Sequence, residues 1–263
     1  MWDPAQYRRY SDERSRPFFE LLARVGAAAP RYVVDLGCGP GNLTAALARR
    51  WPAAEVVGVD SSVEMLTAAE AQPRDRQHAG GGSLTFQLGD VRDFAPARPP
   101  EVIICNAVLQ WIPGHRNLLP RWAGMLCPGG WLAIQVPGNH DQPSHQILRE
   151  LAASPRWRES LADVITARQT DDPGDYLELL ARAGCEVDAW ETTYLHVLRG
   201  DDPVLEWYKG SGLRPVIAAL PPNQADEFLK AYASRLRTAY PPHGYGTMLP
   251  FRRVFVVARI ADR

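Results

Sequence analysis

The feature that most constrains the fold is a run of glycines between a strand-forming and a helix-forming segment. Residues 32–36 read YVVDL, glycines follow at 37, 39 and 41, and the helix-forming stretch LTAALARR comes next. Glycine tolerates positive φ angles and allows a ligand to approach the backbone closely. A strand, a glycine turn and a helix start form the arrangement that cradles nucleotide-like ligands in α/β folds. We therefore predict that Gly37, Gly39 and Gly41 contact a cofactor, with a ligand-free tight turn as the alternative.

Two acids near this loop indicate the charge of the ligand. The loop reads D-x-G-x-G-x-G from Asp35, whereas dinucleotide-binding loops read G-x-G-x-x-G. A carboxylate at the front repels phosphate and favours a cation, held directly or through water. Asp60 closes the next strand, EVVGVD, and an acid about 20 residues beyond such a loop is placed to accept hydrogen bonds from ribose hydroxyls. The pattern favours a phosphate-free, positively charged nucleoside such as S-adenosylmethionine.

Polar residues at the ends of other predicted strands extend this candidate site. Asp90 ends the third strand, where a carboxylate can accept a hydrogen bond from an exocyclic amine such as that of adenine. A solvated turn carboxylate is the alternative for Asp90. Ser61 is predicted to cap a helix, with Glu64 completing a capping box. The predicted cofactor residues are Asp35, Gly37, Gly39, Gly41, Asp60, Ser61, Asp90, Val91 and Asn106.

The order of the segments predicts the fold class. Strand and helix patterns alternate from residue 31 to about 136, which is typical of βαβ units and a parallel sheet. We expect an α/β fold with a doubly wound, mostly parallel, Rossmann-like seven-stranded sheet, and a final strand, FRRVFVVARI, inserted antiparallel beside its neighbours. The whole chain, 1–263, is expected to be one domain. Within it we expect an N-terminal helical flap at 1–28, a cofactor-binding half at 31–136 and a helical substrate cap at 203–245.

Composition and charge narrow the class of protein. The 263 residues are 46% hydrophobic and 22% charged, enough for one large domain with a full core. A net charge of −1 provides no global basic field for nucleic acid. No apolar run approaches the roughly 20 residues of a membrane span, and the N-terminus MWDPAQYRRY is unlike a signal peptide. The four cysteines have no paired spacing, so we expect free thiols, a cytoplasmic location and no metal site.

Blocks spread over essentially the whole chain resemble one enzyme family. The string DLGCGPG at 35–41 resembles motif I of the class I methyltransferases. More specific blocks are similar to the trans-aconitate 2-methyltransferase family: WDP at 2–4 with ERSRPFFELL at 13–22, NAVLQWIP at 106–113, GCEVDAWETTYLH at 184–196, SGLRP at 211–215 and PFRRVFVVAR at 250–259. The resemblance implies a class I methyltransferase fold and methyl transfer from S-adenosylmethionine to one carboxylate of trans-aconitate. The implied products are the monomethyl ester and S-adenosylhomocysteine.

A carboxylate that accepts a methyl group needs little help from acid or base catalysis. Its reference pKa is near ~4, so it is already an anion at neutral pH and needs no general base. Orientation and exclusion of water then carry the reaction, and we expect no obligatory catalytic acid or base. Trp111, just past the fourth strand, and Tyr194 are expected to position the reactants. A core tryptophan is the alternative for Trp111.

The carboxylates of such a substrate need cationic and hydrogen-bonding partners. Arginine matches carboxylates bidentately, although exposed arginines are also common on ordinary surfaces. Strand alternation sends one of Arg252 and Arg253 inward, and the sequence leaves open which. Tyr194 and His196 share one strand face, and a structural histidine is the alternative for His196. The predicted substrate residues are Arg14, His140, Tyr194, His196, Arg214, Arg252 and Arg253.

Three other functions remain as alternatives. The first is a carboxyl methyltransferase for another small polycarboxylate or a carrier-bound malonyl group. The second is a nicotinamide-dependent oxidoreductase, which the loop spacing disfavours. The third is a nucleoside-binding protein without catalytic activity. For the preferred function we expect a small polycarboxylate partner, no nucleic acid, no membrane, and a monomer or weak homodimer.

Overall fold

The chain folds into two compact units in the computed structural model, which describes residues 11–72, 80–162, 164–165, 170–210 and 212–261. For Ser11, Asp12 and Arg14 it describes the backbone alone. The sheet unit comprises Ser15–Pro137, Thr170–Glu191 and Val254–Arg263, and the helical unit comprises Met1–Arg14, Gly138–Gln169 and Thr192–Arg253. Residues 1–10 of the predicted N-terminal flap, 1–28, lie outside the described residues, and a helix covers Ser11–Ala23 of the rest.

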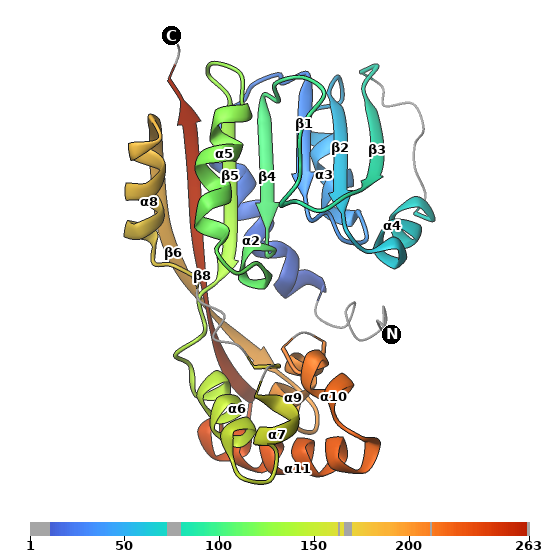
Figure 1. Cartoon of the computed structure of the whole chain (residues 1–263), viewed down its shortest axis with the longest axis vertical. Helices are drawn as coiled ribbons and strands as arrows, with labels where there is room; N and C mark the ends of the chain where they lie inside the picture. The colour runs from blue at the N-terminus through green and yellow to red at the C-terminus, as the bar shows by residue number, and fades with distance from the viewer. Residues whose placement is uncertain (1–10, 73–79, 163, 166–169, 211, 262–263) are drawn as a thin grey trace. The chain divides into compact units, whose positions relative to one another are not determined.

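The sheet has the predicted topology. Among the described residues, seven strands pair in the order β3-β2-β1-β4-β5-β8-β6, and the short strand β7 pairs with β8. Strands β1 to β5 pair in parallel, and the arrow of β8 opposes that of β4 (Figure 1). The bounds are β1 Tyr32–Leu36, β2 Glu55–Asp60, β3 Ser83–Leu88, β4 Val102–Asn106, β5 Trp131–Pro137, β6 Cys185–Leu198, β7 Pro242–His243 and β8 Gly246–Ile260.

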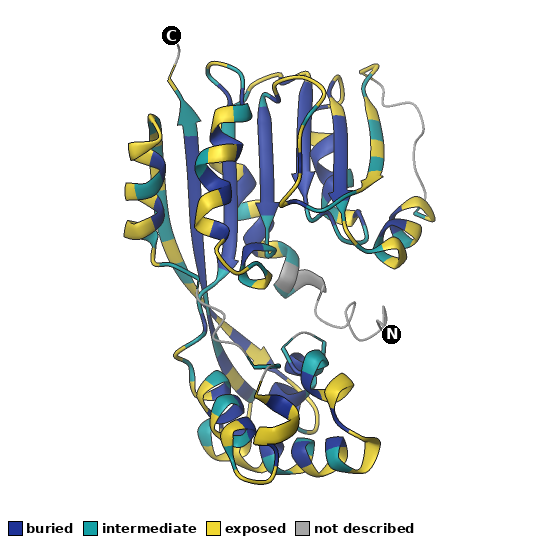
Figure 2. Ribbon diagram, in the orientation of Figure 1, coloured by how far each residue is buried: buried dark blue, intermediate teal, exposed yellow. Residues whose placement is uncertain are grey.

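Central strands form where β-branched residues run without alternation. All five residues of β1 are buried, as are four of the five residues of β4, because helices cover both faces (Figures 1 and 2). Such continuous apolar runs are typical of parallel sheets. Helices α5 and α8 lie on one face, and α2 and α3 on the other. The bounds are α2 Ser11–Ala23, α3 Asn42–Arg50, α4 Val63–Glu70, α5 Leu118–Met125 and α8 Pro173–Arg182.

The helical unit has a separate hydrophobic core. Its centre includes Leu161, Leu213, Phe228, Tyr232 and Leu249, which are fully buried. The residues of the predicted cap, 203–245, supply three of its helices, and two more come from the segment after β5. The bounds are α6 Pro143–Ala153, α7 Arg158–Leu161, α9 Pro203–Lys209, α10 Arg214–Ala219 and α11 Pro222–Ala239.

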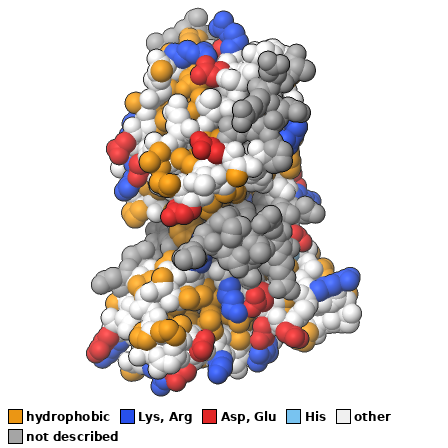
Figure 3. Space-filling view, turned by 90° about the vertical axis from the view of Figure 1, so that its right-hand side faces the viewer, with side chains coloured by type: hydrophobic (Ala, Val, Ile, Leu, Met, Phe, Trp, Pro, Cys, Tyr) orange, Lys and Arg blue, Asp and Glu red, His pale blue; other side chains and the backbone are white. Residues whose placement is uncertain are grey.

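Surface charge agrees with a balanced composition. Positive and negative side chains are interspersed over the coloured part of the face in Figure 3. Within the described ranges, no helix is long and apolar enough to cross a membrane.

Candidate functional site

The glycine loop is held against the end of β2. The N–H groups of Gly37 and Cys38 both donate to the carbonyl of Val59, at 2.7 and 3.0 Å. Gly37 has φ of 76°, and a Cβ atom there would lie 2.2 Å from Cγ2 of Val108. Conformation and space therefore both require glycine. Gly41, with φ of 78°, caps the start of α3.

A side-chain hydrogen bond also joins Gly39 of the loop to Asp60 at the end of β2. The N–H of Gly39 donates to Oδ2 of Asp60 at 2.8 Å, and the N–H of Ser62 donates to Oδ1 at 2.9 Å. A carboxylate has about four acceptor positions, so each oxygen can accept a further hydrogen bond. A Cβ at Gly39 would have no heavy atom within 4 Å. The structure thus brings together a fixed carboxylate and open space, as a ribose-binding acid requires.

Asp35 adds a second negative group to this region. It is buried, and its Oδ2 accepts a hydrogen bond from Oγ1 of Thr44 at 2.7 Å. Burial raises the pKa of Asp35 to about 6, the Thr44 hydrogen bond opposes this rise, and the charge of Asp60 adds to it. Asp35 is therefore mostly ionised at neutral pH. Two neighbouring carboxylates favour a cation over a phosphate.

Asn106 supplies a polar atom at the end of β4. Its Oδ1 is buried and accepts no hydrogen bond from the residues that the structure describes. The next residue, Ala107, has φ of 58°, a conformation that is uncommon for a non-glycine residue and that recurs at functional sites. The Ala107 N–H donates to the carbonyl of Gln135 at 2.8 Å, which holds this turn on β5. An unsatisfied buried acceptor beside a left-handed residue suits a ligand site, and the contact of Asn106 with a cofactor stays a prediction.

The prediction that Ser61 caps the next helix is wrong by one residue. Helix α4 begins at Val63, and the Oγ of Ser62 accepts the N–H of Met65 at 3.2 Å. Ser62 is the cap because Asp60 draws its N–H back toward the strand end. Ser61 is exposed, and its contact with a cofactor stays a prediction.

Asp90 lies in a tight internal ion pair. Nε of Arg92 lies 3.0 Å from each of its oxygens, and Nη2 lies 2.6 Å from Oδ2. Hydrogen bonds from Arg92 lower the pKa of Asp90. The carboxylate is thus already paired, and its contact with adenine stays a prediction, as does that of the buried neighbour Val91.

Trp111 lies in a short 3-10 helix, Leu109–Trp111, in the sheet unit. Trp111 is 45% exposed. The alternative prediction, that it is a core tryptophan, is therefore wrong. Leu109 of the same turn is buried and supplies the core contact instead. A positioning role for Trp111 stays a prediction.

In the helical unit the structure brings several predicted substrate residues together. Tyr194 and His196 are buried and their rings stack at 6.0 Å, as their shared strand face predicts. The His196 ring also stacks on Trp207 at 4.9 Å and lies 6.0 Å from Phe251. The guanidinium of Arg253 lies over the Phe251 ring at 4.4 Å and is buried. A cation, an imidazole and a phenol thus share one aromatic cluster.

The other predicted substrate residues are more dispersed. Arg252 is half-buried, and its N–H donates to Oδ1 of Asn139 at 2.7 Å. Arg214 begins α10 and is half-buried. The carbonyl of His140 accepts a hydrogen bond from Nη1 of Arg149 at 2.7 Å. The side chain of Arg14 lies outside the described residues.

Sequence reasoning missed two buried polar clusters. In the helical unit, the hydroxyls of Tyr208, Tyr232 and Tyr240 gather around Ser144. These tyrosines occupy apolar positions of helical segments, so their spacing indicates core packing. The one local signal is the pair Pro143 and Ser144, which indicates the start of a helix but not its hydroxyl partners.

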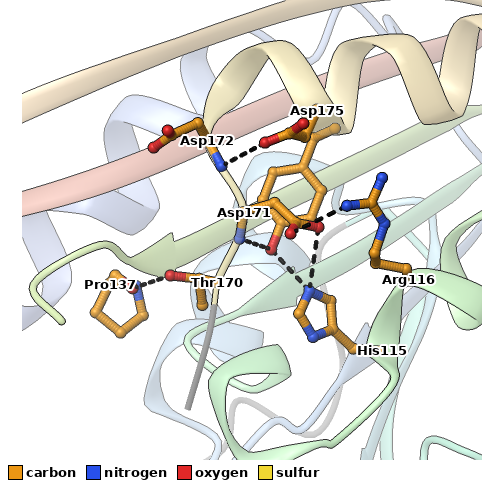
Figure 4. Close-up of polar contacts among 8 residues, drawn as sticks. His115, Arg116, Pro137, Thr170, Asp171, Asp172 and Asp175 are labelled. Carbon is orange, nitrogen blue, oxygen red and sulfur yellow. Dashed lines mark hydrogen bonds and ion pairs between the residues drawn. The ribbon is translucent and has the colours of Figure 1, made fainter. Parts of the chain in front are cut away.

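The second missed cluster is in the sheet unit (Figure 4). Nε2 of His115 lies 2.8 Å from the Tyr176 hydroxyl, which also accepts the N–H of Asp171 at 3.3 Å. Arg116 pairs with Asp171 at 3.2 Å, and the Thr170 hydroxyl donates to the carbonyl of Pro137 at 2.8 Å. The cluster fixes the start of α8 against β5 and the turn before α5.

The described residues show neither a metal cluster nor a reactive thiol. They contain no group of three or more His, Cys, Asp or Glu side chains that could hold a metal ion. All four cysteines are free. Burial raises the pKa of the Cys38 and Cys105 thiols, which makes both poor nucleophiles at neutral pH.

Comparison with known proteins adds a family to this geometry. A family described as a methyltransferase domain matches residues 7–189. The chain is 53% identical to the trans-aconitate 2-methyltransferase of Streptomyces avermitilis over 262 residues, covering 98% of this chain and 96% of that protein. It is 52% identical to the protein of the same name from Rhodococcus jostii, covering 99% and 100%.

Solved structures share the fold at much lower identity. The plantazolicin methyltransferase BpumL in complex with a pentazolic desmethylPZN analog and SAH has a TM-score of 0.54 at 15% identity, covering 98% of this chain and 92% of that chain. The cyclase SpnF has a TM-score of 0.59 at 14% identity, covering 95% and 82%. Because one neighbour is a methyltransferase and the other is a cyclase, these likenesses show the fold alone.

Proposed function

We propose that this chain, which belongs to the trans-aconitate 2-methyltransferase family, transfers the methyl group of S-adenosylmethionine to one carboxylate of trans-aconitate. The products are the monomethyl ester and S-adenosylhomocysteine. The observation that carries the proposal is an identity of about half over nearly the full length of both chains. Such similarity includes the helical unit as well as the glycine loop.

The residues of the sheet unit fit S-adenosylmethionine. Asp60 has acceptor positions left for the ribose hydroxyls after its two backbone hydrogen bonds. Open space at Gly39 admits the ligand to the backbone, and the buried Oδ1 of Asn106 needs a donor. The negative charges of Asp35 and Asp60 favour the cationic groups of this molecule. When bound, it supplies an electrophilic methyl group on a sulfonium.

The acceptor carboxylate needs no proton removed before it attacks. Protein side chains therefore act by holding the acid in line and by excluding water, for which an effective-concentration gain of ~7–11 kcal/mol is available. We propose that Trp111 and Tyr194 position the reactants and that no side chain is an obligatory acid or base. Residues 203–245 are proposed to serve substrate binding and residues 1–28 to cover the cofactor.

Cations of the helical unit are proposed to hold the carboxylates that are not methylated. Arg253 is the best supported, because its guanidinium is buried in the cluster with Tyr194 and His196. Arg214 and Arg252, both half-buried, are proposed as further contacts, together with His140 and Arg14. The partner is a small polycarboxylate, and the oligomeric state is proposed to be a monomer or weak homodimer.

The test is methyl transfer from labelled S-adenosylmethionine. The protein is incubated with trans-aconitate, other di- and tricarboxylates, and a carrier-bound malonyl group, and label in the ester fraction is counted. We expect label in trans-aconitate above all, and loss of label in Asp60→Ala. Label only in the carrier-bound malonyl group would replace the proposed substrate. No label in any acid, with S-adenosylmethionine still bound, would favour a nucleoside-binding protein.

A further inference from the structure

The first residues of α6 hold a cluster of buried hydroxyls. The hydroxyl of Ser144 lies 2.8 Å from that of Tyr208, and the Tyr240 hydroxyl lies 3.3 Å from the same Ser144 oxygen. The Ser144 N–H donates to the Tyr240 oxygen at 3.1 Å, and Tyr232 donates to the Ser144 carbonyl at 3.0 Å. Ser144, Tyr208 and Tyr232 are at most 3% exposed and Tyr240 is 6% exposed. All four residues belong to the helical unit.

The three linked hydroxyls of this cluster have one more donor proton than acceptor contacts. Ser144, Tyr208 and Tyr240 carry three hydroxyl protons, but only two hydroxyl-to-hydroxyl contacts join them. Whichever way each contact is oriented, one proton is left without an acceptor among the described residues. The Tyr232 proton is already bound to a carbonyl. A buried donor left unsatisfied is costly, on the order of 1–3 kcal/mol, so the surplus proton calls for an acceptor from outside the cluster.

The charge beside the cluster is positive. Arg253 lowers the pKa of Tyr208, although burial, the larger effect, raises it, so the hydroxyl stays protonated at neutral pH. Trp207, which precedes Tyr208 on α9, has its ring 5.4 Å from that of Phe251. The Arg253 guanidinium lies over the same Phe251 ring. Trp207, Tyr208 and Phe251 belong to the same core of the helical unit. A cation and a surplus hydroxyl donor beside one core suit an anion, which accepts from both.

We propose that Tyr208 donates its hydroxyl proton to a carboxylate of the acid substrate that also accepts from Arg253, and that this carboxylate is not the one methylated. Ser144 then donates to Tyr208 and fixes its orientation, and Tyr240 donates to Ser144. The inference rests on the proposed function and extends it by naming a specificity residue. Neither the aromatic spacing of α9 nor the resemblance of the chain pointed to Tyr208.

The test compares Tyr208→Phe with Tyr232→Phe. Both remove one buried phenol hydroxyl from the same cluster, but only the first removes the proposed donor. A hydrogen bond to a charged group suggests a roughly ten- to hundred-fold rise in KM for trans-aconitate in Tyr208→Phe. We expect KM for S-adenosylmethionine to stay within about twofold, and Tyr232→Phe to change neither KM by more than about twofold. Equal KM changes in the two variants would overturn the inference.

A second measurement identifies the carboxylate. Mesaconate, itaconate and glutaconate each lack a different carboxylate of trans-aconitate, and their inhibition constants are measured against methylation of trans-aconitate. We expect Tyr208→Phe to raise the inhibition constants of two of these acids. The inhibition constant of the third, which lacks the contacted carboxylate, should stay unchanged. Equal weakening of all three would show a general loss of folding and overturn the inference. Failure of the wild-type protein to methylate trans-aconitate would instead overturn the proposed function.

Discussion

Nε2 of His115 lies 2.8 Å from the hydroxyl of Tyr176, and both side chains are buried in the sheet unit. Burial lowers the pKa of His115 from its ordinary value of 6.5. Asp171 opposes the shift, and Arg116 adds to it. The folded protein therefore holds this imidazole neutral at a pH where the unfolded chain has already protonated it.

The first prediction concerns stability in mild acid. The unfolded state binds more protons at His115 than the folded state once the pH falls below about 6.5, so this residue contributes stability above that pH that is lost on acidification. Denaturant unfolding of the wild type and of His115→Gln at pH 7.5 and 5.5 measures it. The wild type should lose more stability than the variant between these pH values. The same loss in both would show that His115 does not titrate as its burial implies.

The second prediction uses the raised pKa of Asp35. Because this pKa is about 6, the carboxylate loses its charge as the pH falls through that value. The affinity for S-adenosylmethionine should fall with it, by at most about tenfold for each pH unit for a single proton. Calorimetric titration from pH 7.5 to 5 measures this. The isosteric Asp35→Asn should bind more weakly at pH 7.5 and show a flatter profile, whereas a wild-type profile without slope would remove Asp35 from cation binding.

The third prediction separates two glycines of the same loop. Gly37→Ala introduces a methyl group 2.2 Å from Val108 at a positive φ, so it should destabilise the fold by about 2 kcal/mol or more. Gly39→Ala meets no heavy atom within 4 Å, so its stability cost should be limited to that of the positive φ, about 1 kcal/mol.

The affinity for S-adenosylmethionine should be sensitive to Gly39→Ala, the variant with the smaller cost in stability. The methyl group of Gly39→Ala enters the space proposed for the ligand, so the remaining folded protein should bind S-adenosylmethionine at least tenfold more weakly. Thermal unfolding and calorimetry on both variants provide the measurements. Unchanged affinity in Gly39→Ala would place the ligand elsewhere.

The fourth prediction decides between the two adjacent arginines of β8. Lysine keeps the charge but cannot bind a carboxylate bidentately. Arg253→Lys should therefore raise KM for trans-aconitate by about tenfold or more, without changing the affinity for S-adenosylmethionine. Arg252→Lys should raise it by no more than about threefold, because Arg252 is half-buried and its position is set by a backbone contact to Asn139. Steady-state kinetics on both variants test this, and the opposite ranking would make Arg252 the main contact.

Strong local patterns predicted the parts of the fold that depend on them. The segments YVVDL and EVVGVD coincide with β1 and β2, because continuous β-branched runs between turn residues leave few alternatives. The cap of α4 was misplaced by one residue, since Ser61 and Ser62 are equally good caps and only the contact from Asp60 to the Ser62 N–H decides. Strand β8 begins at Gly246, before the expected start, because pairing with β7 extends it.

The candidate site was predictable in the sheet unit and much less so in the helical unit. The glycines and Asp60 follow a fixed spacing along the chain, so their nearness could be expected, although the hydrogen bond from the Gly39 N–H to Asp60 at 2.8 Å was not predicted. Arg253 and Tyr208 are far apart in sequence, and no local pattern records the electrostatic effect of one on the other. A buried tyrosine on a helix also has the same periodicity as a leucine, so its hydroxyl leaves no trace in the spacing.

The close approach of Gly37 and Val108 links two loops that are 71 positions apart. A side chain at the first position has room only where the second is reduced to something smaller than valine. Substitutions at these two positions should therefore be correlated. Homologues with alanine or serine in place of Gly37 should carry glycine or alanine in place of Val108.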